Sequence, residues 1–80
     1  MELIITSPLH KDILNVTWLE LNTPEGNFIV QEGHAPMIVL LTKESEIIYS
    51  LSNGTKQSRF AAQGIAQITR KMVTIIMQES

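Results

Sequence analysis

The chain has 80 residues, enough for one domain with a single hydrophobic core and marginal stability. It contains no cysteine, which excludes disulfides, thiolate zinc sites and cysteine nucleophiles. The net charge is −2 and the basic residues are scattered, with only Arg70 and Lys71 adjacent, which excludes the clustered positive charge of a nucleic-acid surface.

Hydrophobic residues occur only in short runs. The longest, residues 37–41, has about five residues, whereas a membrane-spanning helix needs roughly 20. The chain begins with Met1 and Glu2 and shows no basic segment ahead of an apolar one, so we identify no secretory signal. These features are typical of a protein of a reducing, cytoplasm-like compartment.

The first two predicted strands lie before residue 22. Residues 3–6 are rich in β-branched side chains and end before Pro8, and residues 15–21 carry apolar side chains on both parities. A β-bulge near Trp18 would turn Val16 and its apolar neighbours to one face and Trp18 outward, as an interface anchor. An unbulged strand would turn Trp18 inward, as a core residue.

A short apolar run, residues 28–30, lies between two turns. Residues 25–27, Glu-Gly-Asn, form the first turn, and residues 33–36, Gly-His-Ala-Pro, form the second. In the second turn glycine accepts a positive φ and proline fixes the backbone, so we predict a rigid loop. His34 at its apex has two open roles: bonding backbone groups of its own loop, or contacting a partner.

The second half of the chain alternates short strands with turns. Asn53 and Gly54 predict a two-residue type I′ hairpin, because both residues accept a positive φ. Gln63 and Gly64 are expected to separate two strands. The strands of this half are predicted at residues 37–42, 46–51, 56–62, 65–69 and 73–77.

Short runs with turn signals about every eight to twelve residues are typical of an all-β sandwich or barrel. Alternation within these runs predicts which side chains form the core. The predicted core residues are Leu3, Ile5, Val16, Leu19, Leu21, Phe28, Ile47, Tyr49, Ile68, Val73 and Ile75.

No catalytic centre, metal site or cofactor site is predicted. Ser7, Glu32 and His34 supply triad residue types, but the chain lacks the Gly-x-Ser-x-Gly turn that exposes a nucleophilic serine. The two histidines are too few and too far apart for a metal site. The carboxylates of Glu44 and Glu46 are better explained as a solvated strand end than as an acid–base pair.

An ordered series of segments resembles a known family. These are residues 3–8 (Leu-Ile-Ile-Thr-Ser-Pro), the acid-glycine turn at 24–28, the tetrapeptide Gly-His-Ala-Pro at 33–36, residues 59–64 and residues 73–76 (Val-Thr-Ile-Ile). In this order they resemble the N-terminal β-sandwich domain of the epsilon subunit of F-type ATP synthases, over nearly the whole chain. Departures from the family pattern occur at Ile29, Glu32, Glu44, Ser45 and Gln63; they affect loop details and leave the strand pattern intact.

The resemblance implies one domain, residues 1–80, folded as a two-sheet β-sandwich of about ten short strands. It implies a non-catalytic rotor subunit that docks on the gamma subunit and the c-ring and couples ion flow to ATP synthesis. Such a subunit lies peripherally at the cytoplasmic face of the membrane and does not insert into it. By the same analogy, Glu25, Gly26 and Asn27 face the polar loops of the c-ring, while Ser7 and His34 face gamma.

Epsilon subunits commonly carry a C-terminal helical hairpin that restrains ATP hydrolysis and, in some members, binds ATP. These 80 residues leave no room for it after the last predicted strand, so we expect no such inhibition and no ATP binding. The alternative function is a free-standing β-sandwich that binds a peptide or small ligand. A rotor subunit should co-purify with gamma and c subunits, whereas a free-standing module should be stable and monomeric.

Overall fold

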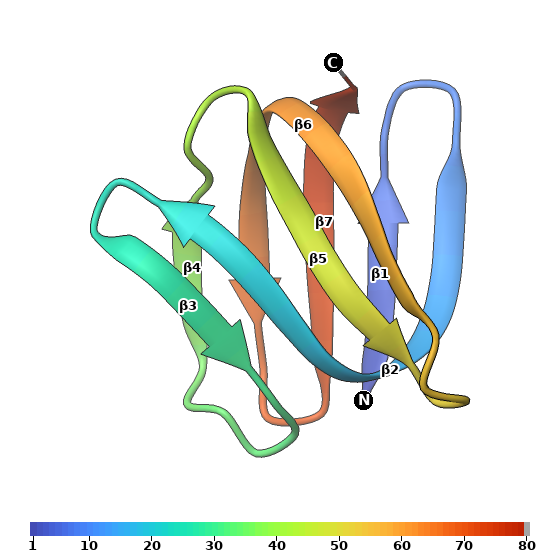
Figure 1. Ribbon diagram of the computed structural model, residues 1–80. Helices are drawn as coiled ribbons and strands as arrows, with labels where there is room; N and C mark the ends of the chain where they lie inside the picture. Colours follow the sequence, from blue (N-terminus) through green and yellow to red (C-terminus); the bar gives the residue numbers. More distant parts are fainter. Residues whose placement is uncertain (80) are drawn as a thin grey trace.

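The computed structural model describes residues 1–79, in which the chain forms seven β-strands and no helix (Figure 1). The all-β class is confirmed, and the expected number of about ten strands is wrong. The strands are β1 (Glu2–Thr6), β2 (Lys11–Thr23), β3 (Gly26–Val30), β4 (Met37–Leu40), β5 (Ser45–Leu51), β6 (Lys56–Ile68) and β7 (Met72–Glu79).

Strand β6 accounts for one strand of the difference in strand number. Residues 56–62 and 65–69 were expected to be separate strands, but β6 runs through Gln63 and Gly64 without a break. Gln63 and Gly64 pair with Gln78 and Met77 of β7, and the extra residue is Ala62, in a register shift between Ala61 and Gln63. A strand that bends in this way serves both layers of the fold.

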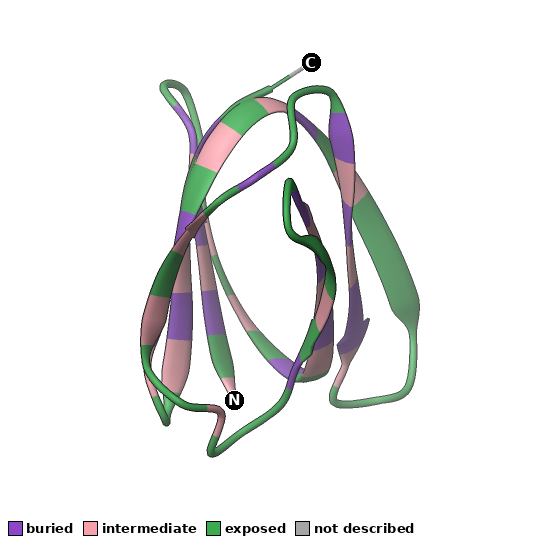
Figure 2. Ribbon diagram, turned by 90° about the vertical axis from the view of Figure 1, so that its left-hand side faces the viewer, coloured by how far each residue is buried: buried purple, intermediate pink, exposed green. Residues whose placement is uncertain are grey.

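Pairing joins the strands in a closed ring. The order is β1-β7-β6-β5-β2-β3, with β4 paired to β6, and a further pairing of β1 with β2 closes the ring. All pairings are antiparallel except that of β1 with β7. The two expected sheets are therefore parts of one hydrogen-bonded sheet folded into two layers (Figure 2).

Strands β2 and β6 each cross from one layer to the other. The first half of β2 pairs with β1, and the second half pairs with β5 and β3. The first half of β6 pairs with β5, and the second half pairs with β7 and β4. We call β3, β5 and the adjoining halves of β2 and β6 layer one, and β4, β7, β1 and the other two halves layer two.

The predicted bulge in β2 is confirmed. The register with β5 shifts between Val16 and Trp18, so that Val16, Leu19 and Leu21 are all buried between the layers. Trp18 points away from the core and stays partly exposed, and the Nζ of Lys56 lies 5.9 Å from the centre of its ring. Trp18 is therefore covered by a cation of its own chain.

The core between the layers contains every predicted residue except Phe28. Phe28 is only half-buried, because β3 pairs with β2 alone and forms an edge of layer one. Alternation missed five further buried residues, two of them alanines too small to stand out in a hydrophobic pattern. These five are Val30, Leu41, Ala61, Ala66 and Met77.

The β5–β6 hairpin forms as predicted, with a different turn. Gly54 has φ 91° and donates its N–H to the carbonyl of Leu51 over 2.9 Å, while Leu51 donates to Thr55 over 2.8 Å. Among the described residues only Glu44 and glycines have a positive φ, so the type I′ assignment is wrong at Asn53. Asn53 Oδ1 instead accepts the N–H of Thr55 over 2.9 Å, which favours a three-residue loop.

Candidate docking surface

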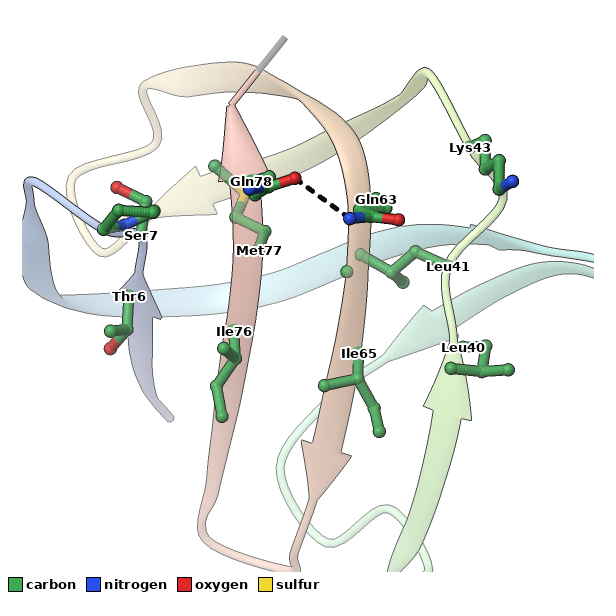
Figure 3. Close-up of a pocket in the computed structure, with 12 residues that line it drawn as sticks. Thr6, Ser7, Leu40, Leu41, Lys43, Gln63, Ile65, Ile76, Met77 and Gln78 are labelled. Atoms are coloured by element: carbon green, nitrogen blue, oxygen red, sulfur yellow. Dashed lines mark hydrogen bonds between the residues drawn. The ribbon is translucent and has the colours of Figure 1, made fainter.

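The outer face of layer two carries exposed aliphatic side chains on three adjacent strands. They are Ile38 and Leu40 of β4, Ile65 of β6 and Ile76 of β7, with exposed fractions between 37% and 66%. Leu40 pairs directly with Ile65, and Ile65 pairs directly with Ile76. Figure 3 shows these three side chains in a row. We call the four residues the apolar face.

A hollow of about 780 Å³ lies over the part of this face formed by Leu40, Ile65 and Ile76. Its lining is mostly apolar, and Leu41 and Met77 belong to the buried core beneath it. Gln63 Nε2 donates to Gln78 Oε1 over 2.9 Å at one end of the hollow, and Lys43 stands at its side (Figure 3). Contiguous apolar surface of this kind is characteristic of a site that binds another protein or a ligand.

Gly64 allows the sheet to pack closely under the hollow. A Cβ atom at this position would lie 3.0 Å from the Cβ of Met77 and 3.1 Å from the Cδ1 of Leu41. It would also lie 3.1 Å from the carbonyl oxygen of Ile76, which belongs to the paired strand. Because Gly64 has no side chain, β6, β7 and the segment after β4 can approach one another this closely.

Ser7 lies at the rim of the hollow, in the turn between β1 and β2. Its N–H donates to the carbonyl of His10 over 2.8 Å, and its Oγ lies 3.2 Å from Glu79 Oε1. The residue is buried, at 8% exposure. Ser7 therefore stabilises the turn. Its side chain is already bonded within its own chain, so a partner would contact a residue that is held in place.

His34 lies in the loop between β3 and β4. Its Nδ1 is 2.8 Å from the carbonyl oxygen of Ala35, and its N–H donates to the carbonyl of Gln31 over 3.1 Å. Gly33, with φ 89°, donates its N–H to the carbonyl of Arg70 over 2.8 Å. His34 thus bonds its own loop, the first of its two possible roles, and the loop is tied to the β6–β7 turn.

The tip of the β2–β3 hairpin is the turn at Pro24 and Glu25, whereas Gly26 and Asn27, which the sequence placed in the turn, begin β3. Gly26 has φ 126°, and Thr23 Oγ1 donates to its carbonyl over 2.9 Å. Asn27 Nδ2 donates to Glu20 Oε2 over 3.1 Å and lies 3.0 Å from Asn22 Oδ1. Glu25 is exposed at the apex, so of the three predicted contact residues its carboxylate is the most available to a partner.

One cationic side chain crosses between the layers. Arg59 Nη1 donates to Asp12 Oδ2, and Nη2 donates to Glu79 Oε1 over 2.8 Å. Burial alone would lower the pKa of Arg59, but its bonds to Asp12 and Glu79 outweigh burial and raise that pKa. We call Arg59, Asp12 and Glu79 the Arg59 cluster. No sequence pattern indicated it, because its members are far apart in the chain.

The family model for the ATP synthase delta/epsilon chain β-sandwich domain matches residues 1–80. The chain belongs to this family. The family resemblance drawn from the sequence is thereby confirmed, and the ATP synthase domain it describes accounts for the two-layer fold.

Two solved structures have the fold of this ATP synthase domain. A chain of the Euglena gracilis mitochondrial ATP synthase (OSCP, F1 and c-ring, rotational state 1) is 20% identical with a TM-score of 0.83, and the match covers 94% of this chain and 48% of that one. A chain of the Tetrahymena thermophila mitochondrial ATP synthase central stalk and c-ring is 10% identical with a TM-score of 0.84, covering 99% and 63%. The search of curated proteins found no match.

The ATP synthase domain spreads its predicted contact residues over separate places. Gly33, next to His34, bonds the turn that precedes β7, whereas Ser7 bonds Glu79, the last residue of β7. Ser7 and His34 therefore lie at opposite ends of layer two, and no triad can form from them. The Glu25 tip belongs to layer one, so the predicted residues form no single site.

Sequence reasoning missed the apolar face of the ATP synthase domain, although a signal was present. Residues 37–41 are apolar on both parities, as are residues 75–77, and a strand covered on one side only should alternate. A two-sided apolar strand indicates that its outer side is also covered. Within residues 1–79 no helix is long and apolar enough to span a bilayer, and no group of acidic residues and histidines could hold a metal ion.

Proposed function

We propose that this chain is a non-catalytic rotor subunit of an F-type ATP synthase that docks on the gamma subunit and the c-ring. The observation that carries the proposal is the apolar face of layer two, in a chain that matches the ATP synthase delta/epsilon family along its full length. A rotor subunit has to hold its partners through stable contacts while the stalk turns. Burial of aliphatic side chains supplies such contacts.

We assign the apolar face to gamma. Ser7 at the hollow and the loop around His34 border layer two at its two ends, so both residues predicted to face gamma adjoin the same surface. The hollow can take protruding apolar side chains of a partner, and Lys43 can meet a carboxylate at its side. Large, partly apolar contacts of this kind are typical of long-lived complexes.

We assign the Glu25 tip to the c-ring. The tip is exposed, polar and narrow, which suits the polar loops that a ring of membrane subunits presents outside the bilayer. Its charge fits a contact that sets register and orientation more than binding strength. The domain is then a peripheral part of the complex, and it transmits rotation driven by ion flow to the catalytic head without chemistry of its own.

Capture of purified gamma subunit by the chain tests the assignment. The double variant Leu40→Gln, Ile76→Gln adds polar groups to the apolar face, and we expect it to weaken gamma binding at least tenfold with little change in stability, because both side chains are exposed. Ile29→Gln is the matched control, since Ile29 is 50% exposed on β3, in the other layer.

Equal gamma binding by the double variant and the wild type would remove the apolar face from the docking surface. A chain that stays monomeric and binds neither gamma nor the c-ring would overturn the rotor proposal. That result would favour the free-standing module, for which the hollow would be the binding site.

A further inference from the structure

Along one side of the molecule the two layers are not joined by strand pairing. The first half of β2, residues 11–15, pairs only with β1, and the first half of β6, residues 56–60, pairs only with β5. These two free strand edges belong to different layers and lie at the right-hand side of Figure 1. We call this side the seam. At one end the N–H of Ser52 donates to the carbonyl of Asn15 over 3.1 Å, and along the rest of the seam side chains hold the layers together.

The Arg59 cluster bridges the seam. Arg59 projects from the first half of β6, and its two carboxylate partners lie on the first half of β2 and at the end of β7. The guanidinium side chain is 21% exposed, while the carboxylates are 48% and 46% exposed. A planar guanidinium that serves two carboxylates fixes both in direction as well as in distance.

The cluster extends to the rim of the hollow through Glu79. The same oxygen, Oε1, that accepts the bond from Arg59 over 2.8 Å lies 3.2 Å from Ser7 Oγ. Ser7 in turn closes its turn by exchanging backbone bonds with His10, at 2.8 and 3.3 Å. The position of the turn therefore depends on where Glu79 is held, and Arg59 holds it.

We propose that Arg59 is a positioning residue that orders the Ser7–His10 turn at the edge of the docking surface. It acts from the other layer, through Glu79, and touches no partner itself. Loss of Arg59 removes the bridge and leaves two like charges side by side at the seam, which pushes Glu79 away from the turn. The consequence for docking rests on the proposed function, but the ordering of the turn does not.

Amide hydrogen exchange of the whole chain, followed by NMR, tests the ordering. In Arg59→Met and in the milder Glu79→Gln we expect the amides of Ser7 and His10 to exchange roughly three- to tenfold faster, while core amides of β7 keep their protection. The matched control is Lys56→Met, which removes a positive charge from the same half of β6; Lys56 is exposed and lies over Trp18 in layer one, away from the turn.

Unchanged protection of the turn in a folded Arg59→Met chain would overturn the proposal. The wild-type chain offers a second measurement that does not depend on a variant folding. Salt screens partly exposed ion pairs, so raising the ionic strength from about 0.05 to 1 M should speed exchange at Ser7 relative to Met72, the first residue of β7, whose N–H donates to Thr69 Oγ1 in the turn at the other end of that strand. Equal effects of salt on both turns would contradict the role of Arg59.

Binding to purified gamma subunit tests the functional consequence. We expect Arg59→Met to weaken binding about three- to tenfold although Arg59 lies outside the apolar face, and Lys56→Met to leave it unchanged. A loosened turn with wild-type gamma affinity would remove the turn from docking. If the wild-type chain fails to bind gamma, the rotor proposal falls, and the exchange result still decides whether Arg59 orders the turn.

Discussion

Gly64 is the residue where the docking surface and the core come closest together. A methyl group there meets a backbone carbonyl and two core side chains at 3.0–3.1 Å, and the carbonyl cannot move without disturbing the β6–β7 pairing. We expect Gly64→Ala to lower the free energy of unfolding by about 1–3 kcal/mol in urea titration. The neighbouring Gln63→Ala, which changes an exposed side chain, should shift it by less than about 0.5 kcal/mol. A Gly64→Ala chain of wild-type stability would contradict this prediction and show that β7 can shift to make room for the methyl group.

Because of Tyr49, the free energy of unfolding of the chain is expected to change with pH in the alkaline range. Burial raises the pKa of its phenol above 10.0, and the nearby positive charge of Arg59 only partly offsets this. Because the folded state holds its proton more tightly than the unfolded state, the stability from this group is fully present below pH 10.0 and is lost as the pH rises above it.

Urea titrations at increasing pH measure this dependence. We expect the unfolding midpoint of the wild type to fall above about pH 10, and the midpoint of Tyr49→Phe to fall less steeply, whatever its value at neutral pH. Parallel curves for the two chains would assign the alkaline loss to other groups.

At the scale of elements, local pattern predicted the strands better than it predicted their ends. Apolar side chains on both parities near Trp18 indicated the bulge in β2, because only an extra residue reconciles them with one buried face. Gly64 misled in the opposite direction. A glycine read as a strand end is here a place where two strands and a loop pack closely, and that reason lies in residues far away in the sequence.

The β5–β6 hairpin depends on the backbone of one residue. Gly54 has φ 91°, which a β-branched side chain adopts only with strain, so Gly54→Val should lower the free energy of unfolding by about 1–3 kcal/mol. Asn53→Ala loses only the bond to Thr55 and should cost about 1 kcal/mol or less. Chemical denaturation compares the two variants. A Gly54→Val chain as stable as Asn53→Ala would mean that the loop has changed to a turn without a positive φ.

At the scale of the whole molecule, the predicted contact residues are separated by the length of β7 and by the two layers. Sequence motifs identified Ser7, Glu25 and His34 as turn residues, which they are. Nothing in the motifs states that β7 runs from the turn beside His34 to the turn beside Ser7. That distance follows from the register of β7 against β1 and β6, which only the folded chain supplies.

Separate contact regions should respond separately to mutation. Glu25→Lys reverses the charge at the tip of layer one, and we expect it to weaken binding to the c-ring several-fold while gamma binding stays unchanged. Glu2→Lys makes the same charge change on β1, in layer two, and should leave c-ring binding intact. Binding to each partner can be measured by surface plasmon resonance. Equal losses toward both partners in Glu25→Lys would show that the two contacts are one.

The parallel pairing of β1 with β7 also has a consequence for how the chain reaches its fold. Leu3 pairs with Val73 and Ile5 pairs with Ile75, so the ring can close only after the last strand has formed its pairing with the first. Joining segments so distant in sequence carries a large loop-closure entropy in the transition state, and sandwich folds with such contacts form in roughly milliseconds to seconds. On the ribosome, β1 can pair early only with β2, and until β7 emerges its other edge is open to any neighbouring strand.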